Sequence, residues 1–194
     1  TAMLLCCKHS GLANDYERLD HPLQQRIKAI IADFADQPVE ELDVGIDGCS
    51  MPSYSLPLSS IAYAYARLAS WPDGPYSTSS ELLWQAATGH PEFIAGTRRF
   101  DTELMRVAKG ALLSKTGADG MHAIAVKPCP DYPHGLGIAI KIVDGDASQK
   151  IRPALVKEVL SRLNLWHWDD SLDGLLPSLT NYRGQTIGSM FYHF

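Results

Sequence analysis

Apolar residues recur at the spacing of an α-helix along much of the chain. The clearest run lies between Pro22, which suits the first turn of a helix, and Pro38, which ends it. Its apolar residues share one helical face: Leu23, Ile27, Ile30, Ile31 and Phe34. The same spacing predicts further helices over residues 3–10, 58–68, 81–87, 102–108 and 151–163.

The centre of the chain combines a helix with two strands. Asp101 or Thr102 is suited to cap the helix. Residues 111–113 then form an apolar run too short for another helix, and Gly117-Ala118-Asp119-Gly120 has the residues of a tight turn. Residues 121–127 are predicted to return as a second strand. This stretch therefore predicts a helix packed on an antiparallel pair.

Three other stretches have the character of strands, over residues 43–47, 135–143 and 185–194. The sequence has no internal repeat and no low-complexity linker. We therefore expect one α+β domain over residues 1–194, with helices flanking an antiparallel sheet.

Composition excludes several classes of protein. The 194 residues carry a net charge of −5 and no Lys/Arg-rich run, which argues against a nucleic-acid partner. No apolar stretch is long enough to cross a bilayer, and no signal-peptide pattern occurs. The four cysteines include no CxxC pair, which fits a reducing, cytoplasmic setting.

The first candidate site is the run Ser114-Lys115-Thr116-Gly117 at a predicted strand end. Lys-Thr-Gly after a strand is typical of penicillin-recognising serine hydrolases, in which the lysine supports a serine nucleophile and binds a substrate carboxylate. The alternative is a solvated lysine that precedes a turn.

The second candidate site is the turn that contains Asp47 and Cys49, constrained by Gly48 and Pro52. Cys49 suits a thiolate nucleophile or a soft metal ligand. The alternative is a small buried apolar residue, which is what a single cysteine usually is. No second cysteine or histidine lies at zinc-finger spacing, so these residues do not form a complete zinc site by themselves.

Taken together, these motifs resemble the rhizobial-type L-asparaginase family, also called asparaginase II. The resemblance spans almost the whole chain, in the family's order and spacing. It rests on these blocks: TAMLLCCKHSG, DHPLQQRI, DGCSMPSYSLPL, HPEFIAGTRRFDTELM, SKTGADG, GLGIAIKIVDGD and NYRGQTIG. It implies a fold like that of serine β-lactamases and glutaminases, hydrolysis of asparagine to aspartate and ammonia, and a zinc ion that tunes the site.

The resemblance also implies roles for individual residues. Lys115 matches the family's active-site lysine, Cys49 a zinc-ligand cysteine and Asp47 the neighbouring site aspartate. Thr116 and Gly117 are then expected to bind the substrate. Cys49 is expected to lie close to Lys115 and, with one matched ligand in this chain, to bind zinc only weakly.

Two motifs of the family do not occur in the sequence, the nucleophilic Ser-x-x-Lys and the Cys-Ser-Gly-Lys-His block. We therefore expect this chain to correspond to the C-terminal part of the enzyme, with the serine upstream. The expected partners are asparagine and either further copies of the chain or the missing N-terminal half.

Two alternative functions remain open from the sequence. In one, the chain is a non-catalytic fragment or subunit that needs a partner carrying the missing half. In the other, Thr1 is an N-terminal nucleophile whose own amine acts as the base. Such a threonine normally opens a strand, whereas residues 2–7 have the pattern of a helix.

Overall fold

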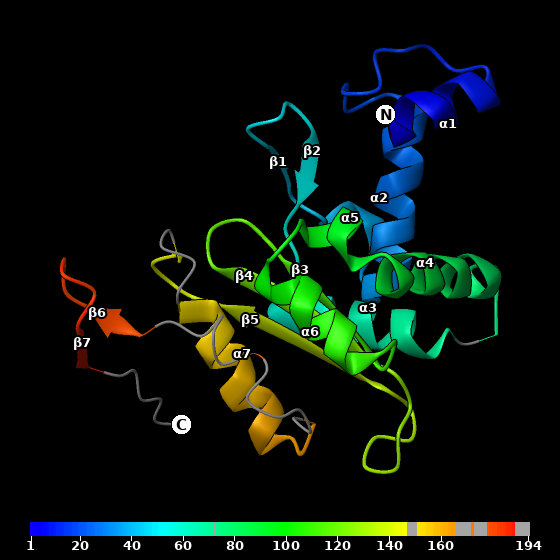
Figure 1. Cartoon of the computed structure of the whole chain (residues 1–194). Coiled ribbons are helices and arrows are strands. Elements are labelled where there is room, and N and C mark those ends of the chain that lie inside the picture. The colour runs from blue at the N-terminus through cyan, green and yellow to red at the C-terminus, as the bar shows by residue number, and fades with distance from the viewer. Residues whose placement is uncertain (72, 147–150, 166–171, 173–177, 189–194) are drawn as a thin grey trace.

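The computed structural model describes residues 1–71, 73–146, 151–165, 172 and 178–188 (Figure 1). Helices alternate with three small antiparallel sheets, so the expected mixture of helices and antiparallel strands is confirmed. The elements are α1 (Ala2–Ser10), α2 (Pro22–Ala35), the 3-10 helix η1 (Val39–Glu41), β1 (Val44–Ile46), β2 (Pro52–Tyr54), α3 (Leu58–Ser70), α4 (Ser77–Gly89), α5 (Pro91–Ala95), α6 (Phe100–Ala108), β3 (Leu112–Thr116), β4 (Met121–Val126), β5 (Leu136–Lys141), α7 (Ile151–Arg162), β6 (Leu179–Thr180) and β7 (Thr186–Gly188).

The central sheet has three strands in the order β3-β4-β5, all antiparallel to their neighbours. Lys115 pairs with Ala123 and Thr116 with His122, so the predicted turn over residues 117–120 does join two paired strands. Gly120 has φ +77°, and a Cβ there would lie 2.8 Å from the carbonyl oxygen of Ile142. This turn therefore requires glycine at that position.

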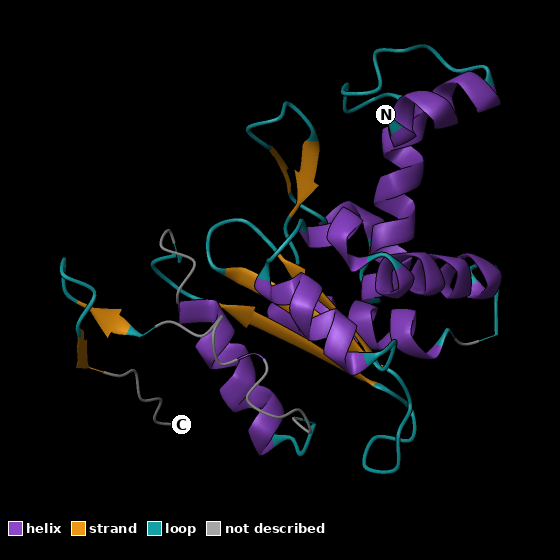
Figure 2. Cartoon of the chain, in the orientation of Figure 1, coloured by secondary structure: helices purple, strands orange, loops and turns teal. Residues whose placement is uncertain are grey.

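Helix α3 covers one face of the central sheet, against β4 and β5 (Figure 2). Strand register places small residues on this face, among them Ala123, Ala125 and Gly137. A Cβ on Gly137 would lie 1.7 Å from the backbone oxygen of Ala62 in α3. The helix backbone thus sits directly on the strand, which only glycine permits.

We expect Gly137→Ala to destabilise the fold by about 3 kcal/mol, because the methyl group must push the α3 backbone off the sheet. For a chain of this size the loss corresponds to a fall in melting temperature on the order of 10 °C. Thermal and urea unfolding measure it. Gly45→Ala is the matched control, since Gly45 also lies in a strand but has open space around its Cβ position. Similar melting temperatures for both variants would refute the close packing.

The other face of the sheet carries the main hydrophobic core. Helices α6 and α7 lie on this side, in front of the sheet in Figure 1. Their apolar residues share one cluster with β3 and β4, including Leu104, Met105, Ile124, Val156 and Leu160, all fully buried. This face also holds the polar residues described below.

Several details differ from the sequence predictions. Helix α6 begins at Phe100, two residues earlier than expected, with Arg99 at its N-cap and no side-chain capping bond, so the proposed capping by Asp101 or Thr102 is wrong. The reason is that Asp101 makes its hydrogen bonds to β3 instead. Strand β2 and helix α5 were not predicted.

At the C-terminal end, β7 falls within the predicted strand over 185–194, of which residues 189–194 lie outside the described residues. The likeness to the serine β-lactamase fold stays a prediction. No helix within the described part of the chain combines the length and apolar character needed to cross a membrane.

Candidate functional site

Lys115, Thr116 and Gly117 lie at the end of β3, the edge strand of the central sheet. The Lys115 side chain is exposed, and its ammonium group donates to the Thr116 carbonyl. Thr116 is partly buried. The predicted placement of this lysine at the end of a strand is therefore confirmed, and its charge is accessible.

Asp101 of α6 binds this strand end through two hydrogen bonds. One of its carboxylate oxygens accepts the Thr116 backbone N–H at 2.9 Å, and the other accepts the Ser114 hydroxyl at 2.7 Å. Among the described residues, β3 pairs with a strand on one side only, and on the other side the helix supplies the hydrogen-bond acceptor that a further strand would provide. The Asp101 carboxylate is buried, with 3% of the residue exposed.

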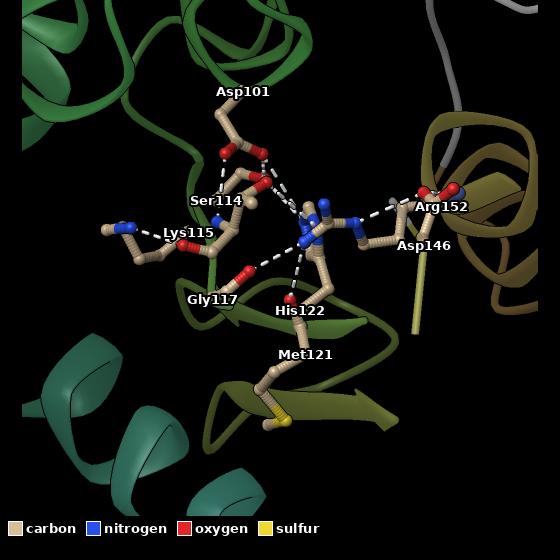
Figure 3. A network of polar contacts seen from close by, with 9 residues as sticks. Asp101, Ser114, Lys115, Gly117, Met121, His122, Asp146 and Arg152 are labelled. Atoms are coloured by element: carbon tan, nitrogen blue, oxygen red, sulfur yellow. Dashed lines mark hydrogen bonds and ion pairs between the residues drawn. The ribbon is translucent and has the colours of Figure 1, made fainter. Parts of the chain in front are cut away.

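His122 of β4 completes a buried polar network (Figure 3). Its Nε2 lies 2.9 Å from the Ser114 hydroxyl oxygen and 3.4 Å from an Asp101 oxygen. Its Nδ1 lies 3.5 Å from the Thr116 hydroxyl. Ser114, Thr116 and His122 lie on one face of the β3–β4 pair, and Asp101 reaches them from the first turn of α6. Hydrogen bonds within this group therefore hold the backbone of the Lys-Thr-Gly run.

The protonation states in this network follow from burial and hydrogen bonding. Burial alone raises the pKa of Asp101, but His122 and the hydrogen bonds from Ser114 and Thr116 outweigh it and hold this pKa below its ordinary value. Burial lowers the pKa of His122, against the opposing effect of Asp101. At neutral pH the carboxylate is therefore ionised and the imidazole is neutral.

Ser114, His122 and Asp101 have the residue types of a catalytic triad but not its arrangement. The Ser114 hydroxyl is fully buried and donates to Asp101, while the imidazole contacts the serine oxygen from the other side. In a triad the histidine must accept the serine proton, and the carboxylate must bind the far nitrogen of the ring. This cluster is therefore not a catalytic triad.

An ion pair between Arg152 of α7 and Asp146 holds the turn that follows Lys115. The Arg152 guanidinium donates to the carbonyls of Gly117 at 2.7 Å and Met121 at 3.2 Å, and to the Asp146 carboxylate at 3.2 Å (Figure 3). Both side chains of the ion pair are buried. The helix thus fixes both ends of the turn over residues 117–121.

No role at the site was predicted from the sequence for Asp101, Ser114, His122 or Arg152, although Ser114 belongs to the run named as the first candidate site. One signal for two of them was present. Ser114 and His122 are both polar residues of the predicted hairpin, and the observed register, which pairs Thr116 with His122, places them on the same face. No comparable sequence pattern indicated their partners, Asp101 of α6 and Arg152 of α7.

Asp47 and Cys49 lie together in the turn between β1 and β2, and the Cys49 N–H donates to the Asp47 carboxylate at 3.1 Å. Cys49 is exposed, so the alternative of a small buried apolar residue is wrong. Figure 1 shows this hairpin standing away from the central sheet.

The two candidate sites are not joined in the part of the chain that the structure describes. Within it, no hydrogen bond or ion pair links the Asp47–Cys49 turn to the Lys115 strand, and no three His, Cys, Asp or Glu residues gather as a metal site would require. The expected proximity of Cys49 to Lys115 stays a prediction.

A cleft of about 390 Å³ lies beside the end of β3. Thr116 and Gly117 line one side of it, so both predicted substrate-binding residues border open space. The other lining residues are Ala118, Asp119, Asp144, Gly145, Asp146 and Arg152.

A protein-family model described as L-asparaginase II matches residues 1–191, nearly the whole chain. No curated protein matches the chain significantly. The family match confirms the resemblance drawn from the sequence motifs.

Proposed function

Because the chain belongs to the L-asparaginase II family, we propose that it takes part in the hydrolysis of asparagine to aspartate and ammonia. The family match, which supports an amidohydrolase activity, is the observation that carries the proposal. The exposed Lys115 at the end of β3 supports it, as does the cleft lined by the neighbouring Thr116 and Gly117.

The proposed reaction proceeds through a serine acyl-enzyme. A serine oxygen attacks the carbonyl carbon of the side-chain amide, the carbon–nitrogen bond breaks and ammonia leaves with a proton. Water then cleaves the ester to give aspartate and the free serine. No Ser-x-x-Lys motif occurs in these residues, and Ser114 is buried, so we propose that the nucleophile comes from outside them.

Within this chain, Lys115 is the proposed source of positive charge. It either keeps the base of the serine neutral or binds the substrate carboxylate. Thr116 and Gly117 are proposed to contact the substrate, because they line the cleft at the end of β3. Asp47 is proposed as a further site residue and fixes the Cys49 turn through the backbone hydrogen bond.

The test is ammonia and aspartate release from L-asparagine, with L-glutamine as the competing substrate. We expect release from asparagine by the protein that also carries the Ser-x-x-Lys segment. If neither amide is hydrolysed by that protein, the proposal fails.

The lack of Ser-x-x-Lys favours one second candidate, a non-catalytic subunit that works only with a partner. Full activity of the isolated 194-residue chain would exclude it. The third possibility, Thr1 as nucleophile, gains no support, since Thr1 precedes helix α1 rather than a strand.

Zinc binding by Cys49 remains a proposal that the described residues support only weakly. A closed zinc site needs about four ligands, and the structure places one exposed thiol and one carboxylate in this turn. The residues present therefore do not fit a tight zinc site.

We expect the chain to bind zinc weakly and Cys49→Ser to abolish that binding. A competition titration against a zinc-chelating dye measures the affinity. Cys6→Ser is the control, because Cys6 is also exposed but matches no ligand position. Tight binding that survives Cys49→Ser would refute the assignment.

A further inference from the structure

The direction of each hydrogen bond in the buried network can be assigned. An ionised carboxylate only accepts, so at 2.7 Å from Asp101 the Ser114 hydroxyl must be the donor. Its single proton is then used, and the close approach of His122 Nε2 at 2.9 Å requires that this nitrogen donate. The imidazole therefore carries its proton on Nε2.

This assignment fixes the Thr116 hydroxyl as well. A neutral imidazole protonated on Nε2 has an acceptor at Nδ1, which lies 3.5 Å from the Thr116 hydroxyl. A hydroxyl proton directed toward this nitrogen satisfies it, through a contact at the long limit of a hydrogen bond. What Thr116 presents to the outside is then oxygen lone pairs, which accept hydrogen bonds and cannot donate one.

The charges that line the cleft beside Thr116 also favour a hydrogen-bond donor. Its lining includes three aspartates and one arginine. Arg152 is paired with Asp146, and Asp119 is paired with Lys141, which leaves the carboxylate of Asp144. The remaining charge is negative. A ligand group that docks here should be a hydrogen-bond donor with positive charge.

We propose that the Asp101–Ser114–His122 network holds Thr116 as a hydrogen-bond acceptor that selects the α-ammonium group of the amino-acid substrate. This inference rests on the proposed function. Thr116 would then be a specificity-determining residue, and His122 a positioning residue that acts through it. Amino acids should be preferred over dicarboxylic ligands of the same length that lack the amine.

Binding of L-aspartate and succinate tests the proposal without turnover. The two differ in the α-amino group, and calorimetry on the complete enzyme gives both affinities. We expect Thr116→Val to reduce the preference for aspartate by about 10- to 100-fold, as for loss of a hydrogen bond to a charged group. Thr116→Ser should restore the preference. A purely structural role would weaken both ligands alike and leave the preference unchanged, which would overturn the proposal.

A second variant tests the role of the network. His122→Gln can place an amide N–H near the former Nε2 position while it removes the acceptor at Nδ1. We expect it to reduce the aspartate preference although Thr116 is intact. An unchanged preference in a folded His122→Gln protein would show that Thr116 needs no such orientation.

The tautomer of His122 can be measured directly by ¹⁵N NMR of labelled protein, which does not depend on any substituted variant folding. We expect the Nε2–H form, and an Nδ1–H form would refute the inference. Ammonia release by the wild-type enzyme distinguishes a failure of the Thr116 role from a failure of the proposed function. A wild-type enzyme that hydrolyses asparagine but binds succinate as well as aspartate refutes only the role of Thr116, whereas absence of hydrolysis refutes the proposed function.

Discussion

Lys115→Ala is expected to reduce ammonia release from asparagine by about 100-fold or more, as does the loss of a group that stabilises charge in an active site. Lys115 is exposed at the end of β3, on the opposite face of the sheet from Thr116, and its removal deletes the positive charge that the proposed mechanism needs at this strand end. Steady-state kinetics on the complete enzyme measure the loss.

The kinetics also separate the two proposed roles of the lysine. If Lys115 binds the substrate carboxylate, KM should rise and Lys115→Arg should retain much of the activity. If it keeps the serine's base neutral, kcat should fall. Lys141→Ala is the matched control, because it removes the same charge from the same sheet, where Lys141 pairs with Asp119 at 3.0 Å. Wild-type activity in Lys115→Ala would refute both roles.

Arg152→Ala is expected to destabilise the protein by about 4 kcal/mol, the cost of breaking a buried ion pair by removal of one partner. The change removes the guanidinium from the buried Asp146 carboxylate, which keeps the backbone N–H donors of residues 151 and 152. It also removes the Arg152 donor from the Gly117 carbonyl and one of the two donors from the Met121 carbonyl. Urea unfolding measures the free energy.

The control for this prediction lies at the other end of the same helix. Arg162 pairs with Glu158 on the surface, with 51% and 37% of their side chains exposed, so Arg162→Ala should cost less than about 1 kcal/mol. A comparable loss of unfolding free energy in the two variants would show that the buried ion pair contributes no more to stability than the exposed one. The turn next to Lys115 should also loosen in Arg152→Ala, which faster amide exchange of residues 117–121 would detect.

Patterns of neighbouring residues in the sequence predicted many of the helices and strands. Helix α2 between its two prolines, α3 after Pro57 and the β3–β4 hairpin around 117–120 appear as predicted, since apolar periodicity and turn residues act over a few neighbouring positions. Errors occurred where a side chain found a distant partner. Asp101 was predicted to cap its own helix, yet it binds Ser114, 13 residues away.

The sequence by itself determined the family, the order of most elements and the position of Lys115 at a strand end, because motifs and periodicity are local properties of the chain. The tertiary structure alone decided that Asp101 and His122 lie beneath that strand and that Arg152 reaches Gly117 across 35 residues. Those contacts depend on how α6 and α7 pack on the sheet. Helix packing is set by the fit of whole surfaces, which no local pattern specifies.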